Sequence, residues 1–229
     1  MLRWVASVAM FAGFAYAAWQ GADAIGRHRD PVVATECIGD PQAAHHAVYL
    51  HGIDSFGPSW QELDNRRTLA RLADAKHLAI AIPRAPVMAG GRRWPQDTVS
   101  GLLETNNAIR DAARACFAST DHLGVIGFSN GGFAIARLYQ KCIASFDWFI
   151  VSGAGGSFGA EGDDLSACGH LAVVVGARDR YHYEFAAQFN RDMLARHADV
   201  NLVEFDGGHR LDFDALMEAI QGFARAPER

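Results

Sequence analysis

Short apolar segments alternate along the chain with longer segments in which apolar residues recur at helical spacing. The short segments are bounded by loops rich in glycine, proline and aspartate, which is typical of buried strands. The longer segments place apolar residues three or four positions apart, which predicts amphipathic helices. The expected strands are residues 47–50, 78–83, 122–128, 146–153, 170–177 and 200–205. The expected helices are residues 59–77, 97–117, 131–144, 181–198 and 210–226.

This alternation predicts the fold class. Strands that are apolar along their whole length are buried on both faces, and such strands form mostly parallel sheets with helices on both sides. We therefore expect an α/β fold in three layers. The connection between residues 153 and 170 is too short for a large cap domain. The expected domain spans residues 46–229, and residues 25–45 before it form an extended leader or an edge segment.

The beginning of the chain has the pattern of an export signal. Arg3 precedes an uncharged, mostly apolar run over residues 4–19. Because a spanning helix needs roughly 20 apolar residues, we predict that residues 1–24 are a signal peptide, cleaved after Ala17 or Ala24. An uncleaved membrane anchor is the alternative. The expected location is secreted or periplasmic.

Cysteine content and charge add two further expectations. The chain of 229 residues has four cysteines, Cys37, Cys116, Cys142 and Cys168. In an exported protein they predict two disulfides in any of three pairings, and four buried thiols are the alternative. The net charge is −5 and no basic stripe is present, so nucleic acid is not an expected partner. The sequence does not indicate an oligomeric state.

The stretch Gly127-Phe128-Ser129-Asn130-Gly131 matches the pattern G-x-S-x-G. It lies between an expected strand and an expected helix, where a sharp turn would expose the hydroxyl group of a nucleophilic serine. Small residues on both flanks let neighbouring backbone approach closely. The alternative is an ordinary glycine-rich junction between strand and helix.

A serine nucleophile needs a histidine as base, and the histidine needs a carboxylate to orient it. On this type of fold the chain order is serine, acid, histidine. Asp179 and His209 each follow an expected strand, and the carboxyl ends of parallel strands meet at one edge of a sheet. We therefore predict Ser129, Asp179 and His209 as catalytic residues. Asp163 and Asp164 are the alternative acids, and Asp179 could instead cap the helix after it.

An oxyanion hole needs two backbone N–H groups aimed at the developing negative charge. The amide of Asn130, directly after the serine, is one candidate. The turn His51-Gly52 follows the first expected strand, and the amide of Ile53 after it is the second candidate. Both assignments use backbone atoms alone.

Two other polar groups have simpler explanations. A metal site at His45-His46 and His51 is not expected, because strand alternation scatters these side chains and no carboxylate accompanies them at ligand spacing. The loop that contains Arg92, Arg93 and Trp94 could reach the mouth of the site and bind an acidic or aromatic acyl group. We favour a surface loop packed by its tryptophan.

Together these motifs resemble those of the α/β-hydrolases. The stretches "LHGI", "GFSNGG" and "DGGH" are similar to those of compact carboxylesterases, lysophospholipases and polyester depolymerases, and the resemblance runs from about Ala47 to the end of the chain. It implies hydrolysis of a small or polymeric carboxylic ester through an acyl-enzyme on Ser129, with His209 moving the proton and Asp179 orienting the histidine. It implies no metal ion or organic cofactor. A peptidase, a thioesterase or a non-catalytic binding protein on the same fold are the alternatives.

Overall fold

The computed structural model describes residues 35–54, 59–88, 90–156 and 162–223. The predicted signal peptide, residues 1–24, lies outside these ranges, as does the leader up to residue 34. Within the part of the chain that is described, no helix is both long and apolar enough to cross a membrane.

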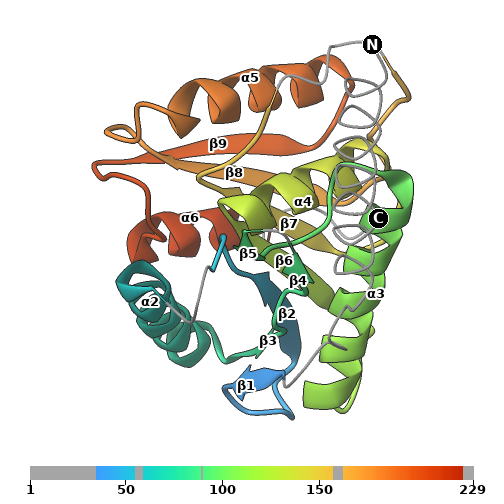
Figure 1. Cartoon of the computed structure of the whole chain (residues 1–229), viewed down its shortest axis with the longest axis vertical. Helices are drawn as coiled ribbons and strands as arrows, with labels where there is room; N and C mark the ends of the chain where they lie inside the picture. The colour runs from blue at the N-terminus through green and yellow to red at the C-terminus, as the bar shows by residue number, and fades with distance from the viewer. Residues whose placement is uncertain (1–34, 55–58, 89, 157–161, 224–229) are drawn as a thin grey trace, which may run out of the picture.

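A seven-stranded sheet forms the centre of the molecule, with strand order β1-β3-β2-β6-β7-β8-β9 (Figure 1). Its strands are β1 (Glu36–Ile38), β2 (His45–Leu50), β3 (Leu78–Ile82), β6 (Leu123–Phe128), β7 (Trp148–Ser152), β8 (His170–Gly176) and β9 (Val200–Phe205). The strands from β3 to β9 in this order are all parallel, and β1 alone pairs antiparallel, with β3 at the edge. The predicted fold class is therefore confirmed.

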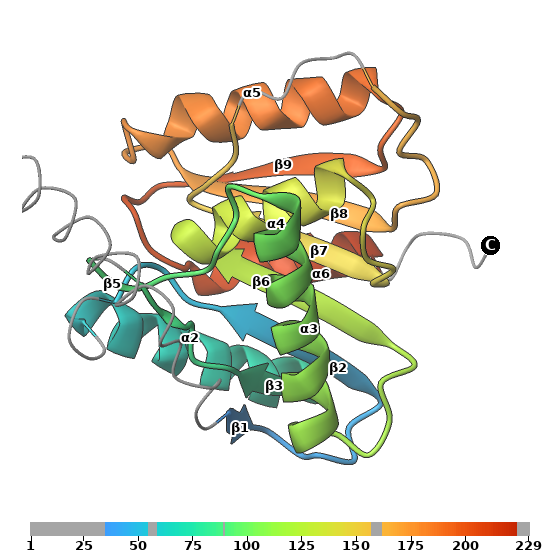
Figure 2. The ribbon, with the colours of Figure 1, turned by 45° about the vertical axis from the view of Figure 1, so that its right-hand side comes forward.

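Helices cover both faces of the sheet, as the two views together show (Figures 1 and 2). The helices are α2 (Trp60–Lys76), α3 (Val99–Cys116), α4 (Asn130–Gln140), α5 (His182–Ala195) and α6 (Phe213–Phe223). The apolar residues of α3, α4 and α5 form one core with the sheet. Those of α2 and α6 form a second core on the opposite face. Because both faces are covered, the central strands are buried along their length, which explains their continuous apolar sequences.

The expected helices and strands are all present, with small shifts at their ends. Serine and threonine hydroxyl groups cap α2 and α3: Ser59 accepts from the N–H of Glu62, and Thr98 accepts from that of Gly101. The leader contributes β1 to the sheet edge. A short hairpin of β4 (Val87–Met88) and β5 (Gly91–Arg92) lies in the loop after β3 and was not anticipated.

Two disulfides join the four cysteines, as predicted for an exported chain. Cys37 in β1 is bonded to Cys116 at the end of α3, and Cys142 after α4 is bonded to Cys168 before β8. Sequence alone left three pairings open. The structure selects this one because it brings each pair of Cα atoms to 5.6 Å. Disulfides of this kind fit an oxidising compartment.

Candidate active site

The sequence-predicted residues lie after the carboxyl ends of parallel strands. Ser129 directly follows β6, Asp179 follows β8, and His209 follows β9. Strands β8 and β9 are paired neighbours, while β6 is separated from β8 by β7 alone. The sheet therefore brings residues that are 30 and 50 positions apart in the chain to one edge, which is where α/β folds bind their ligands.

Ser129 occupies a strained turn between β6 and α4. Its φ and ψ angles are 52° and −117°, a conformation that non-glycine residues rarely adopt and that is often found at functional sites. Glycines make the turn possible. A Cβ atom on Gly127 would lie 2.5 Å from the carbonyl oxygen of Gly131, and one on Gly131 would lie 2.1 Å from that of Leu50. The glycines of the motif are thus required by close backbone packing.

Asp179 and His209 are joined by a hydrogen bond of 2.6 Å between Oδ2 and Nδ1. The carboxylate of Asp179 is buried, and its Oδ1 also accepts from the backbone N–H of His182 at 3.3 Å. Asp179 therefore both orients the histidine and caps the start of α5, so the two roles considered from sequence coexist. Burial alone would raise the pKa of Asp179, but hydrogen bonds from His182 and His209 outweigh burial and hold that pKa below its ordinary value.

His209 is held from several sides. Its ring contacts that of Phe128, the residue before Ser129, with centroids 4.6 Å apart. A Cβ atom on Gly153 would lie 2.9 Å from the ring, so glycine is needed there for close approach. From helix α2, the side-chain amide of Gln61 donates to the carbonyl oxygen of His209, and Asn65 Oδ1 accepts from the N–H of Leu211 at 2.9 Å. These contacts fix the loop that carries the histidine.

Burial lowers the pKa of His209 below the ordinary histidine value. The hydrogen bond to Asp179 acts in the opposite direction and raises it, while the nearby imidazole of His182 lowers it further. The net direction is downward, so the ring is neutral at neutral pH. A neutral imidazole whose Nδ1–H is bound to a carboxylate presents Nε2 as a proton acceptor.

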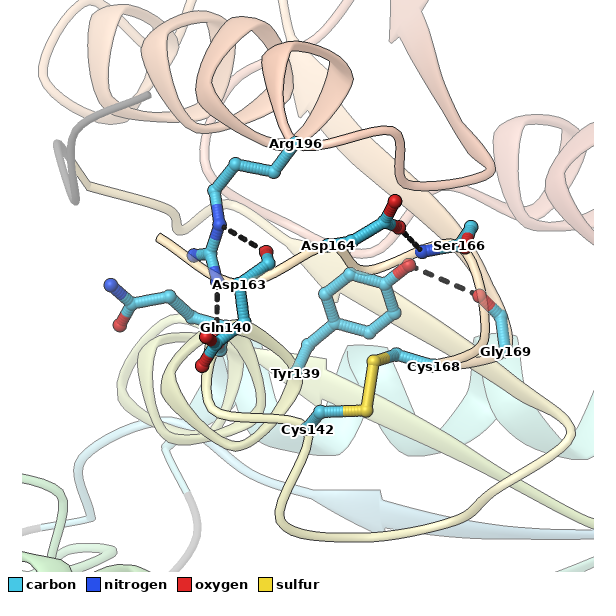
Figure 3. The surroundings of a disulfide bond; sticks show 9 residues. All are labelled: Tyr139, Gln140, Cys142, Asp163, Asp164, Ser166, Cys168, Gly169 and Arg196. Carbon is cyan, nitrogen blue, oxygen red and sulfur yellow. Dashed lines mark hydrogen bonds between the residues drawn. A yellow bond between two sulfur atoms is a disulfide. The ribbon is translucent and has the colours of Figure 1, made fainter. Parts of the chain in front are cut away.

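The alternative acids lie elsewhere. Figure 3 shows Asp163 and Asp164 near the disulfide Cys142–Cys168, which precedes β8 and so lies at its amino end. Asp164 accepts from the N–H of Ser166, and the carbonyl oxygen of Asp163 accepts from the buried guanidinium of Arg196. The structure brings Asp179 to His209 and does not bring this pair of aspartates there.

The turn after β2 lies against the serine. A Cβ atom on Gly52 would be 3.3 Å from the Cβ of Ser129. The ring of His51 fixes this turn, because Nε2 accepts from the N–H of Ala85 at 3.1 Å and Nδ1 therefore carries the proton that is donated to the carbonyl oxygen of Gly52 at 2.6 Å. Since the peptide is trans, the N–H of Ile53 points away from that carbonyl oxygen.

Asn130 begins α4, and its side chain is buried instead of facing solvent. Its Oδ1 accepts from the backbone N–H of Trp94 at 2.7 Å, and the indole N–H of Trp94 donates to the carbonyl oxygen of His51 at 3.1 Å. Trp94 is only 1% exposed, so the expected packing role of this tryptophan is confirmed. Arg92 in the same loop donates to the carbonyl oxygen of Ala85. The loop thus ties both candidate oxyanion segments together.

Sequence reasoning missed His182, which contacts both Asp179 and His209. Among the described residues, Asp179, His182 and His209 form a group whose ligand atoms are close enough to hold a metal ion. The same atoms make the hydrogen bonds between these side chains. A polar cavity of about 270 Å³ also borders His51, with Arg66 and Arg84 in its wall.

These features define an α/β-hydrolase fold. Two solved carboxylesterases have similar structures: that of Mesorhizobium loti (18% identity, TM-score 0.63, covering 86% of this chain and 99% of that one) and that of Bacillus cereus (16% identity, TM-score 0.64, covering 87% and 95%). Esterase PE8 is also similar, with 18% identity and a TM-score of 0.59, covering 82% of this chain and 96% of its own. No family profile and no curated protein sequence matches the chain.

Proposed function

We propose that the protein is a serine hydrolase that cleaves carboxylic esters through an acyl-enzyme on Ser129. The observation that carries the proposal is the short Asp179–His209 hydrogen bond at the same sheet edge as a serine in a strained turn. A binding protein would have no use for a strained serine next to an oriented imidazole. Esterases among the similar structures add support for this reaction class.

In the proposed reaction, the Ser129 hydroxyl attacks the ester carbonyl carbon and His209 Nε2 takes its proton. The carbonyl oxygen becomes negative and is stabilised by the N–H groups of Asn130 and Ile53. When the tetrahedral intermediate collapses, the proton passes from His209 to the leaving alcohol. Water then attacks the acyl-enzyme by the same route, which releases the acid and restores the serine. Asp179 stays ionised throughout and stabilises the imidazolium.

The surroundings of the site favour an ester with an apolar part. The side chains of Ile53 and Trp60 are apolar and exposed. Ile53 follows Gly52, which lies against Ser129. Trp60 precedes Gln61, which donates a hydrogen bond to the loop that carries His209. Tyr181 is exposed beside His182. An apolar rim of this kind would gain hydrophobic contact with an acyl chain or an aromatic alcohol. The predicted signal peptide, residues 1–24, would export the enzyme, so its ester substrates would be extracellular or periplasmic.

Two measurements test the proposal. A fluorophosphonate probe should label the wild-type protein at Ser129, and S129A should neither label nor hydrolyse an activated short-chain ester while keeping the wild-type unfolding temperature. S119A serves as the matched control, because that serine is exposed and bonds Asp121. A folded S129A variant with wild-type turnover would refute the assignment of the nucleophile. Absence of labelling and turnover in the wild type would favour the non-catalytic alternative.

A further inference from the structure

A second histidine shares the carboxylate of the candidate triad. His182 is the first residue of α5, and its Nδ1 lies 2.9 Å from Oδ1 and 3.1 Å from Oδ2 of Asp179. The side chain of His182 is 15% exposed, so solvent reaches little of it. Because an ionised carboxylate only accepts hydrogen bonds, the Nδ1 atoms of His182 and His209 are both donors. Asp179 therefore receives an N–H from each of two imidazoles.

The two imidazole rings are stacked. The centroids of His182 and His209 are 3.9 Å apart and the rings are inclined by 13°. Stacking fixes the plane of the His209 ring, and the hydrogen bond to Asp179 fixes its rotation about the ring normal. On its other sides His182 contacts Phe133 of α4 and the exposed ring of Tyr181. The charged and titratable groups that face His182 from the neighbouring loops are thus Asp179 and His209. The titratable Tyr181 lies beside His182 in the chain.

We propose that His182 is a positioning residue that aligns the general base, by donating Nδ1–H to Asp179 and by stacking on His209. This inference rests on the proposed hydrolase function. The donated hydrogen bond keeps the carboxylate turned toward His209 Nδ1, and the stacked ring keeps His209 Nε2 in the direction of the proton that it takes up. His182 does not accept that proton and makes no contact with substrate.

The stacked arrangement also affects protonation of the base. The ring of His182 lies 3.9 Å from the imidazole that takes up the serine proton, close enough to influence the charged form of His209. The field of His182 already contributes to the lowered pKa of His209, after the larger effect of burial. Removing the second imidazole should therefore raise the pKa of His209, which moves the acid limb of the rate profile to higher pH.

Two variants separate the hydrogen bond from the ring. H182N replaces the imidazole with an amide N–H close to the position of Nδ1, whereas H182F keeps a stacking ring and loses the donor. We expect H182F to lower kcat roughly tenfold or more, the size of losing a hydrogen bond to a charged group, with KM unchanged. H182N should keep kcat within a few-fold. Both variants should move the acid limb of kcat/KM to higher pH.

H197N is the matched control, since His197 pairs with Asp164 at 3.3 Å and is exposed away from the triad. It should leave kcat and the pH profile unchanged. Unfolding temperatures are recorded for all variants, so that kinetics are compared below the transition. Folded H182F and H182N with wild-type kcat and an unshifted acid limb would overturn the inference. So would H182F retaining kcat while H182N loses it. Fluorophosphonate labelling of Ser129 in the wild type tests the proposed function by itself. A negative result for the His182 variants can therefore be told apart from failure of the proposed function.

Discussion

Replacing His51 by leucine removes two hydrogen bonds from the turn beside the candidate nucleophile while keeping a side chain of similar size. The imidazole of His51 is 3% exposed. It accepts from the N–H of Ala85 at 3.1 Å and donates to the carbonyl oxygen of Gly52 at 2.6 Å. In H51L both backbone groups lose their partner in a largely buried setting.

The size of the effect follows from these two groups. A buried polar group left without a partner costs about 1–3 kcal/mol, so H51L should lower the free energy of unfolding by about 2–6 kcal/mol. For a chain of this length the unfolding temperature falls by about 2–4 °C per kcal/mol. The peptide between Gly52 and Ile53 also loses the contact that orients it. If the N–H of Ile53 is an oxyanion donor, kcat should fall by about 10²–10³-fold, with KM changed little.

Calorimetry and ester hydrolysis together test this prediction. H45L is the control, because His45 is an exposed histidine at the start of β2, the strand that precedes this turn, and its replacement should change stability by less than about 0.5 kcal/mol. H51N keeps an N–H near the Nδ1 position and loses the acceptor for Ala85. It should therefore be destabilised but retain more of kcat than H51L. A folded H51L variant that keeps the wild-type kcat would refute the role of this turn in catalysis.

Three further predictions concern acid-base chemistry and stability. Burial lowers the pKa of His209, and the neutral ring is the active base. In a pH profile, kcat/KM should therefore rise with pH around a midpoint below the ordinary histidine pKa and reach its plateau by neutral pH. A midpoint above the ordinary histidine pKa would contradict the reasoning. D179N should lower kcat by roughly 10⁴-fold, since an amide can favour the wrong imidazole tautomer, whereas D164N should leave kcat unchanged in the same ester assay. Replacing Cys142 and Cys168 together by alanine opens a loop with a sequence separation of 26 and should cost about 3.5 kcal/mol in chemical denaturation. The kcat of that variant should be unchanged below its unfolding temperature, because the disulfide lies at the amino ends of the strands, and a large loss of kcat would show coupling to the site.

The architecture was predictable because its signals are local and strong. The continuous apolar run of β8 and the periodic apolar residues of α3 each indicate one type of element without tertiary information. Chain order and the position after a strand identified Asp179 and His209 as neighbours. The end of the leader pairs with β3 as the edge strand β1, which is one of the two arrangements that the sequence left open.

Contacts between elements were the part that sequence could not supply. His182 lies in the polar and aromatic stretch after Asp179, where sequence alone gives a helix start and no reason to assign the ring to the site. Its approach to His209 depends on how β8 and β9 pair, which puts Gly176 opposite Phe205 and brings their following loops together. The buried link from Asn130 to Trp94 likewise joins residues 36 positions apart. Such pairs are set by the three-dimensional packing of the sheet and its loops.

The strained turn at Ser129 depends on several of these contacts between elements at once. A positive φ at a serine costs about 1–3 kcal/mol and persists only when the surrounding structure over-determines it. Here the N–H of Ser129 donates to the carbonyl oxygen of Ser152, the Asn130 side chain is tied to Trp94, and Gly131 packs against the end of β2. A change that loosens any one of these contacts lets the turn relax and would displace the hydroxyl group of the proposed nucleophile. Turnover should therefore be lost before the fold is.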